Sequence, residues 1–168
     1  LIQAIYFKFF GISWVSYAAH SSSFNTLFAL SFFFTIKKFK LSSEYSFFYS
    51  VLASILMYPT YGIPFTDHHV SIFSILSVFS LCLAIKTGKD IYWFFIPILL
   101  FLGFFTKQTP IGYFGILISL VTFLYLIKNF RKKILLLVFF SSFISILTFC
   151  LIIYFYKIPI GSIIIQYF

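Results

Sequence analysis

A short polar run, Asp67-His68-His69, opens one apolar stretch of the chain, and Lys107-Gln108 precedes another about 40 residues later. A carboxylate in such a place can act as a general base or hold a divalent cation that bridges phosphates. The histidines can donate hydrogen bonds to phosphate oxygens. An ammonium beside the N-terminal end of a helix favours an anion, because the amides of the first turn point toward the same place. Together these residue types indicate a bound anion, such as a lipid phosphate, with a carboxylate beside it.

Both motifs also have plain structural explanations. Thr66 can cap a helix whose dipole favours the carboxylate of Asp67 in its first turn. Lys107 can be an anchor that extends its ammonium to the lipid headgroups. Adjacent residues of a helix point about 100° apart, so His68 and His69 do not readily share one metal ion. The sequence therefore favours no dedicated metal site here.

Composition indicates the surroundings in which these residues act. Of 168 residues, 62% are hydrophobic and only 9% are charged, whereas a soluble domain carries roughly 25% charged residues. The chain has too few polar side chains to cover a core of this size in water, so its solvent must be largely lipid. Membrane-spanning strands would alternate apolar and polar residues, but residues 134–140 are consecutively apolar. Helices are the backbone form that fits lipid.

Six apolar segments approach the length of a membrane span, which is about 20 residues. Part of a further segment precedes them within residues 1–19. We predict an all-α membrane protein, an antiparallel bundle of about six transmembrane helices with short loops, forming a single transmembrane domain over residues 1–168. Because the chain starts at Leu1 and ends at Phe168 inside an apolar run, we expect an internal fragment of a longer polytopic protein. The predicted segments are residues 20–36, 45–64, 66–85, 91–106, 110–127 and 134–156.

The basic residues predict the orientation of this bundle. Nine of the 12 lysines and arginines follow the first, third and fifth predicted segments, which puts them on one side of the membrane. The positive-inside rule makes that side cytoplasmic. The net charge of +9 then reflects loops that meet anionic headgroups, and nucleic acid is not an expected partner. The nine residues are Lys37, Lys38, Lys40, Lys86, Lys89, Lys128, Arg131, Lys132 and Lys133.

In this orientation Asp67 is the one acidic residue on the outer face, since Glu44 and Asp90 fall in cytoplasmic loops. Tyr61 belongs to the outer loop that leads to Asp67, and Gln108 belongs to the next outer loop. Both are weaker candidates for polar contacts. Further weak candidates open the first segment, and they are His20, Ser21, Ser22, Ser23 and Asn25.

Two stretches resemble a known family. The pattern G-x-P-x-T-D-H-H covers residues 62–69, and L-G-F-F-T-K-Q-T-P covers residues 102–110. Over residues 58–115 the chain is similar to the GT-C class of integral-membrane glycosyltransferases, most of all to its protein mannosyltransferases and bacterial aminoarabinose transferases. The resemblance implies a polyprenyl-phosphate-linked sugar donor, bound at the outer face of a bacterial inner membrane, and a lipid, glycan or protein acceptor. Lys107 would match the family lysine near the donor phosphate, and Asp67 the acidic position that opens a span.

The chain departs from that family in one respect. The main catalytic carboxylate of the family lies in the first outer loop, and this sequence has no such acidic loop, so a segment before Leu1 would have to supply it. We predict a membrane glycosyltransferase with Asp67 as a catalytic acidic or metal-associated residue, Lys107 on the donor phosphate, and His68 and His69 as supporting hydrogen-bond donors. The alternatives are a transporter or flippase-like protein and a non-catalytic scaffold. Ionisable groups at the ends of the segments, with apolar centres, favour chemistry at the surface over a path through the membrane.

Overall fold

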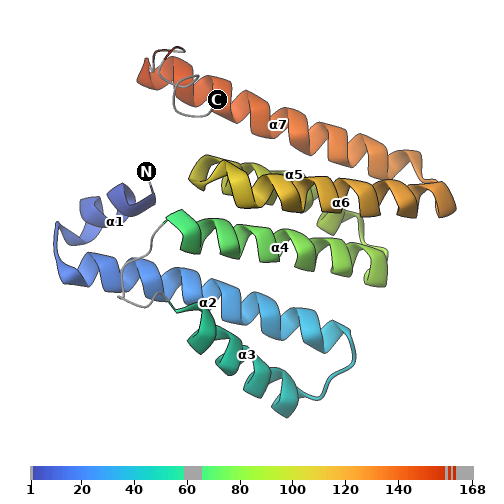
Figure 1. The fold of residues 1–168 in the computed structure, drawn as a ribbon, viewed down its shortest axis with the longest axis horizontal. Helices are drawn as coiled ribbons and strands as arrows, with labels where there is room; N and C mark the ends of the chain where they lie inside the picture. The colour runs from blue at the N-terminus through green and yellow to red at the C-terminus, as the bar shows by residue number, and fades with distance from the viewer. Residues whose placement is uncertain (1, 59–65, 158, 160, 162–168) are drawn as a thin grey trace.

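The computed structural model describes residues 2–58, 66–157, 159 and 161, and its regular secondary structure there is α-helical throughout (Figure 1). Seven helices follow one another in this described part of the chain. The prediction of an all-helical protein is therefore confirmed. The helices are α1 (Ile2–Phe10), α2 (Trp14–Lys38), α3 (Ser43–Met57), α4 (Thr66–Thr87), α5 (Asp90–Thr106), α6 (Gln108–Lys128) and α7 (Lys132–Tyr156).

The six predicted segments coincide in order with α2 to α7, with shifts of one or two residues at most bounds and two larger differences. Helix α2 begins at Trp14 rather than at residue 20, and the second predicted segment runs into residues 59–65, outside the described residues. By length and composition three helices, α4, α6 and α7, can cross a membrane, and α5 is apolar but has only 17 residues. Six crossings stay a prediction, because α2 is interrupted by polar side chains and α3 has 15 residues.

Local chemistry explains where several helices begin. The three acidic residues of the chain, Glu44, Asp67 and Asp90, each lie in the first turn of a helix. The helix dipole favours a negative charge at that position. Ser42 caps α3, because its side chain accepts a hydrogen bond from the Tyr45 amide. The few carboxylates of this chain thus mark helix starts.

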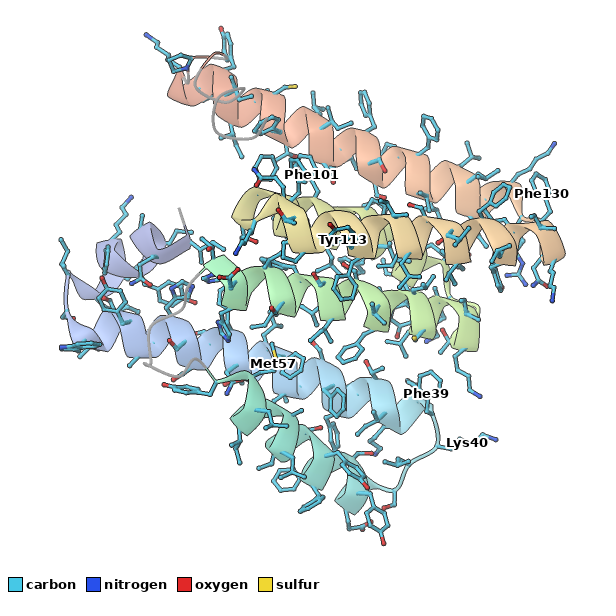
Figure 2. All side chains as sticks on the ribbon, viewed as in Figure 1. Phe39, Lys40, Met57, Phe101, Tyr113 and Phe130 are labelled. Carbon is cyan, nitrogen blue, oxygen red and sulfur yellow. The ribbon has the colours of Figure 1, made fainter. Side chains whose placement is uncertain are left out.

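The helices alternate in direction. Figure 1 shows that α2, α4 and α6 begin at one end of the bundle and that α3, α5 and α7 begin at the other. The loops rich in lysine and arginine therefore gather at one end, where Figure 2 places Phe39, Lys40 and Phe130. There the ammonium of Lys86 lies 5.8 Å from the ring centroid of Phe39 and joins the ends of α4 and α2. We call this the basic end (residues 37–44, 86–90 and 128–133), and the opposite one, with His20, residues 66–69 and Lys107, the histidine end.

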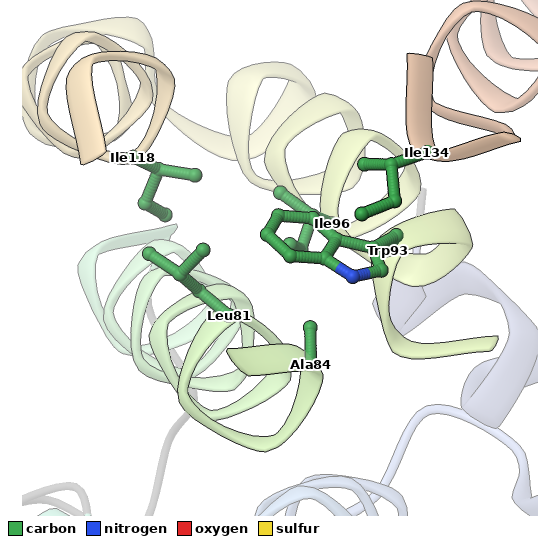
Figure 3. Packing of buried hydrophobic residues seen from close by; sticks show 6 residues of the cluster. All are labelled: Leu81, Ala84, Trp93, Ile96, Ile118 and Ile134. Carbon is green, nitrogen blue, oxygen red and sulfur yellow. The ribbon is translucent and has the colours of Figure 1, made fainter. Parts of the chain in front are cut away.

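Helix α4 lies at the centre of the packing. It contacts α2, α5 and α6, while α7 packs on α5, and α1 and α3 pack on α2. Toward the basic end, apolar side chains from α4, α5, α6 and α7 enclose Trp93, as Figure 3 shows. This buried cluster consists of Leu81, Ala84, Trp93, Ile96, Ile118 and Ile134.

Buried serines let neighbouring helices approach one another closely. The hydroxyls of Ser50, Ser74 and Ser77 each donate to the carbonyl oxygen four residues earlier, at 2.6 to 2.7 Å. Each hydroxyl is thereby satisfied within its own helix, so its burial leaves no donor unpaired. Small residues at helix contacts are typical of bundles in lipid, where close packing replaces the hydrophobic driving force of water.

Candidate functional site at the histidine end

Asp67 and Lys107, predicted from separate motifs, form an ion pair. The Nζ atom of Lys107 lies 2.5 Å from Oδ1 of Asp67, and the side chains are 45% and 66% exposed, respectively. Asp67 is the second residue of α4, and Lys107 lies between α5 and α6. Exposed ion pairs contribute only about 0–1 kcal/mol to stability. The pair is thus accessible and weakly held, so another anion can compete with Asp67 for the ammonium.

Lys107 is the single residue that connects α5 to α6. Its backbone is extended, with φ −163° and ψ 125°, and its amide donates to the carbonyl oxygen of Gly103 at 3.1 Å. Helix α6 starts at Gln108, and Pro110 occupies its first turn, where a missing amide hydrogen costs no helix bond. The ammonium therefore extends from the N-terminal end of a 21-residue helix, where the dipole favours an anion.

Gly103 allows α4, α5 and α6 to converge beside this pair. A Cβ atom built on Gly103 would lie 2.7 Å from Cδ1 of Ile111 in α6 and 3.3 Å from Cβ of Phe73 in α4. Ile111 and Phe73 are themselves buried. A larger side chain at Gly103 would push the three helices apart, one turn below the point where Lys107 reaches Asp67.

His69 turns away from this ion pair and bonds to His20 of α2. The two Nε2 atoms lie 2.7 Å apart, and the side chains are 6% and 0% exposed. Nδ1 of His20 in turn bonds to Oε1 of Gln3 in α1. Tyr6 stacks on the His20 ring with 4.5 Å between ring centroids, and Phe24 lies edge-on to both imidazoles. A buried polar chain thus links α1, α2 and α4 at the same helical turn as Asp67.

His68 points in a third direction and does not join a metal site. Its ring is half-buried near the backbone of Met57 in α3, and neither ring nitrogen bonds to another side chain among the described residues. The ring centroids of His68 and His69 are 5.9 Å apart, with planes at 66°. Within the described residues no three His, Cys, Asp or Glu side chains gather closely enough to hold a metal.

Of three further sequence candidates, two lie at helix starts and the third lies outside the described residues. Gln108 is half-buried in the first turn of α6, next to Lys107. Thr66 is the first residue of α4, so it lies inside the helix rather than preceding it. Tyr61 belongs to residues 59–65, outside the described part of the chain.

Sequence reasoning underrated two residues. His20 was only a weak candidate, and Gln3 was not singled out. An amide and an imidazole within mostly apolar stretches are the signal that could have found them, because polar groups buried in lipid need partners. The sequence does not show which face of its helix each residue occupies. The partner of each residue therefore cannot be predicted from it.

The arrangement combines three chemical capacities. The ammonium of Lys107 can bind an oxyanion together with the start of α6. The carboxylate of Asp67, when released from that ammonium, can accept a proton from a hydroxyl. The His20–His69 bond links α4 to α2 in the same helical turn as that carboxylate. Comparison of the chain with protein-family models, with curated proteins and with solved structures found no match.

Proposed function

We propose that the chain is part of a multi-pass membrane glycosyltransferase that uses a polyprenyl-phosphate-linked sugar at the outer face of a bacterial inner membrane. The acceptor would be the hydroxyl group of a lipid, a glycan or a protein. The observation that carries the proposal is the exposed Asp67–Lys107 pair at the N-terminal end of α6. The ammonium of Lys107 can bind a phosphate, and the carboxylate of Asp67 can accept a proton. Both lie at the end of the bundle that has few cations.

The distribution of charge supports the outer-face location. Nine of the 12 basic residues follow α2, α4 or α6 or end these helices, and so belong to the basic end. If the bundle crosses the membrane, that end faces the cytoplasm, and Asp67 and Lys107 face the opposite compartment. Polyprenyl-phosphate sugars presented in the outer leaflet would reach the pair from the headgroup region.

In the proposed reaction the phosphate of the donor takes the place of Asp67 on Lys107. The acceptor oxygen attacks the anomeric carbon and forms the glycosidic bond, while the bond from that carbon to the phosphate oxygen breaks. The electron pair leaves with polyprenyl phosphate, whose developing charge is stabilised by the ammonium and by the amides at the start of α6. The acceptor proton passes to the carboxylate of Asp67. Gln108, which follows Lys107 in the first turn of α6, offers a further polar contact, whereas His68 points away from the pair.

A cation on Asp67 is a second use of the same carboxylate, since a divalent ion can bridge a carboxylate and phosphates. The described residues at this end provide one carboxylate and no cluster of three potential ligands. The direct use of Asp67 as a base is therefore the simpler mechanism. Transfer that survives treatment with a chelator would support it.

The first test measures binding of undecaprenyl phosphate to the full-length protein in nanodiscs, with undecaprenol as the control that lacks the phosphate. Lys107→Ala should weaken binding about tenfold or more, as expected for loss of a charge-assisted contact. Asp67→Asn should bind at least as well as the wild type, because the competing carboxylate is gone. The matched controls are Lys133→Ala and Asp90→Asn, which break the ion pair at the basic end. Equal affinity for undecaprenol, or equal losses with the control variants, would contradict the proposal.

The second test measures transfer from a panel of radiolabelled polyprenyl-phosphate sugars in proteoliposomes. Asp67→Asn should lose transfer while keeping donor binding, because the proton acceptor is missing. Lys107→Ala should lose both. Unchanged transfer in both variants would remove this site from the mechanism.

One observation favours a transporter as the second candidate. A buried, hydrogen-bonded histidine pair between helices is a feature that proton relays use. Proton-coupled uptake in proteoliposomes, lost in His69→Gln, would support that reading over sugar transfer.

A further inference from the structure

We infer that His20 and Gln3 are positioning residues, which act through His69 to hold Asp67 of α4 against Lys107. The consequence for catalysis depends on the proposed function, whereas the consequence for the geometry of α4 does not. Neither residue touches the ion pair. Both lie on helices that precede α4 in the chain, so the inference extends the site from the first turn of α4 to α1 and α2.

Burial makes the His20–His69 contact a firmer anchor than the ion pair. Both imidazoles are almost fully buried, and two aromatic rings (Tyr6, stacked, and Phe24, edge-on) pack against His20. A hydrogen bond in such a place is costly to break, because each polar group would lose its partner without gaining water. The Asp67–Lys107 pair is exposed and contributes little by itself. The histidine contact therefore fixes the position that the ion pair then uses.

Hydrogen-bond chemistry gives this chain a single direction. The Oε1 atom of Gln3 can only accept, so Nδ1 of His20 must donate to it. In the neutral ring Nε2 of His20 is then without a hydrogen and accepts a bond from Nε2 of His69. Gln3 thus selects the tautomer of His20 that can bind His69. Loss of the Gln3 carbonyl would leave His20 free to adopt the wrong tautomer.

Helix geometry transmits this anchor to the carboxylate. Asp67 and His69 are two residues apart in α4, and so they project about 200° apart around the helix axis. When His69 is bonded to α2 on one side, Asp67 must face the opposite side, where α5 and α6 meet. A rotation of the first turn of α4 would move both side chains together. The position of Asp67 is therefore coupled to the His20–His69 bond.

The chain of bonds ends in a group that cannot conduct a proton further. A carbonyl oxygen of Gln3 accepts the last bond, and the Nε2 atom of Gln3 is buried and has no hydrogen-bond partner within the described residues. A relay needs an acceptor that can release the proton on its far side. The geometry therefore favours positioning over proton transport.

The test measures the distance between the second turns of α4 and α6, next to the ion pair, by electron spin resonance in the full-length protein. Spin labels at Ser71 and Tyr113, both exposed, report on that distance after Cys82→Ala and Cys150→Ala remove the natural thiols. His20→Phe keeps a ring between the two aromatic neighbours and removes the hydrogen bonds, so the distance distribution should broaden. His20→Gln offers an acceptor near the former Nε2 position and should restore the narrow distribution.

Phe28→Leu is the control for simple loss of packing, because Phe28 is buried between α2 and α4 two turns further along and has no link to Asp67. It should lower thermal stability and leave the distance distribution narrow. A narrow distribution in His20→Phe, or equal broadening in Phe28→Leu, would overturn the inference. If His20→Phe does not fold, His69→Leu and His69→Gln repeat the comparison from the side of α4.

Binding of undecaprenyl phosphate to the same variants separates this inference from the proposed function. His20→Phe should bind about tenfold more weakly, since a small displacement of a binding group has effects of that order or larger, and His20→Gln should bind nearly as well as the wild type. If the wild type binds no undecaprenyl phosphate but His20→Phe still broadens the distance, the proposed function fails and the positioning of α4 stands.

Discussion

The two ends of the bundle each hold an ion pair of the same construction. At the basic end, Nζ of Lys133 lies 2.6 Å from Oδ2 of Asp90, and at the histidine end Lys107 and Asp67 are 2.5 Å apart. Each aspartate lies in the first turn of one helix, and each lysine lies at the N-terminal end of a later one. Both lysines oppose the helix dipole, and both aspartates relieve that conflict. Judged by local geometry, the pairs are equivalent.

The two ion pairs differ in the number of charges around them and in the buried side chains next to them. The pair at the basic end is one contact among nine cations, and the apolar cluster around Trp93 lies in the neighbouring interior. The pair at the histidine end shares its helical turn with the buried His20–His69 bond. An ion pair at a helix start is therefore not a sign of function by itself. A buried polar anchor beside it, in a region with few other charges, is the feature that distinguishes the second pair.

The comparison first predicts that the two ends lie on opposite sides of the membrane. Thr109→Cys and Lys89→Cys place thiols at exposed positions near each pair, without removing either, in a protein that lacks Cys82 and Cys150. A membrane-impermeant maleimide should label position 109 in intact cells, and position 89 only after permeabilisation. Labelling of both positions in intact cells would place the pairs on one side and remove the outer-face site.

Reversal of each ion pair is the sharpest functional contrast. The double variant Asp67→Lys with Lys107→Asp keeps an ion pair but puts the carboxylate where the donor phosphate should bind, so transfer should fall about 100-fold or more, as for loss of a preorganised charge. The double variant Asp90→Lys with Lys133→Asp should transfer sugar at nearly the wild-type rate. Radiolabelled product from proteoliposomes measures both. Activity in the first double variant would reduce the Asp67–Lys107 pair to a structural contact.

The interior at the basic end should dominate stability. Trp93 is 1% exposed and packs against Tyr125 of α6, with 5.2 Å between ring centroids. Trp93→Ala should cost about 3–5 kcal/mol, because it opens a large cavity among α4, α5, α6 and α7. Trp14→Ala is the matched control, since that side chain is 71% exposed. Thermal unfolding in detergent compares them, and similar melting temperatures would show that the Trp93 cluster is not a principal core.

Sequence alone predicted the helices well because they depend on local properties. Long apolar runs without alternation indicate helices in lipid, and the charges at helix ends separate one helix from the next. The start of α2 was placed too late because the polar residues from His20 to Asn25 suggested a boundary, whereas the helix continues through them from Trp14. Helix propensity is a local property, whereas packing of α2 against α1 and α4 decides whether these polar residues stay helical.

The candidate site was predictable in part. Asp67 and Lys107 could be assigned to one end from the order of the helices, and the structure brings them into contact. The partner of His69 could not be predicted, because His20 lies 49 residues away and the contact depends on how α2 and α4 are rotated. Gln3 was missed for the same reason. The proposed roles of all these residues stay predictions.

The smallest predicted effect concerns Gly103, and it tests whether the pair at the histidine end depends on the close junction of α4, α5 and α6. Gly103→Ala brings a methyl group against Ile111, so it should lower stability by about 1 kcal/mol, the net of overpacking and improved helix propensity. Adding Ile111→Val removes the nearest methyl and should recover most of the loss. Gly112→Ala, with no atom within 4 Å of the new Cβ, should instead stabilise the protein by about 0.5–1 kcal/mol.

Thermal unfolding measures the stability of all three variants, and undecaprenyl phosphate binding should weaken only in Gly103→Ala. If Gly103→Ala is as stable as Gly112→Ala and binds as well, Lys107 reaches Asp67 without help from the junction, and the histidine end then resembles the basic end more closely than the buried contacts suggest.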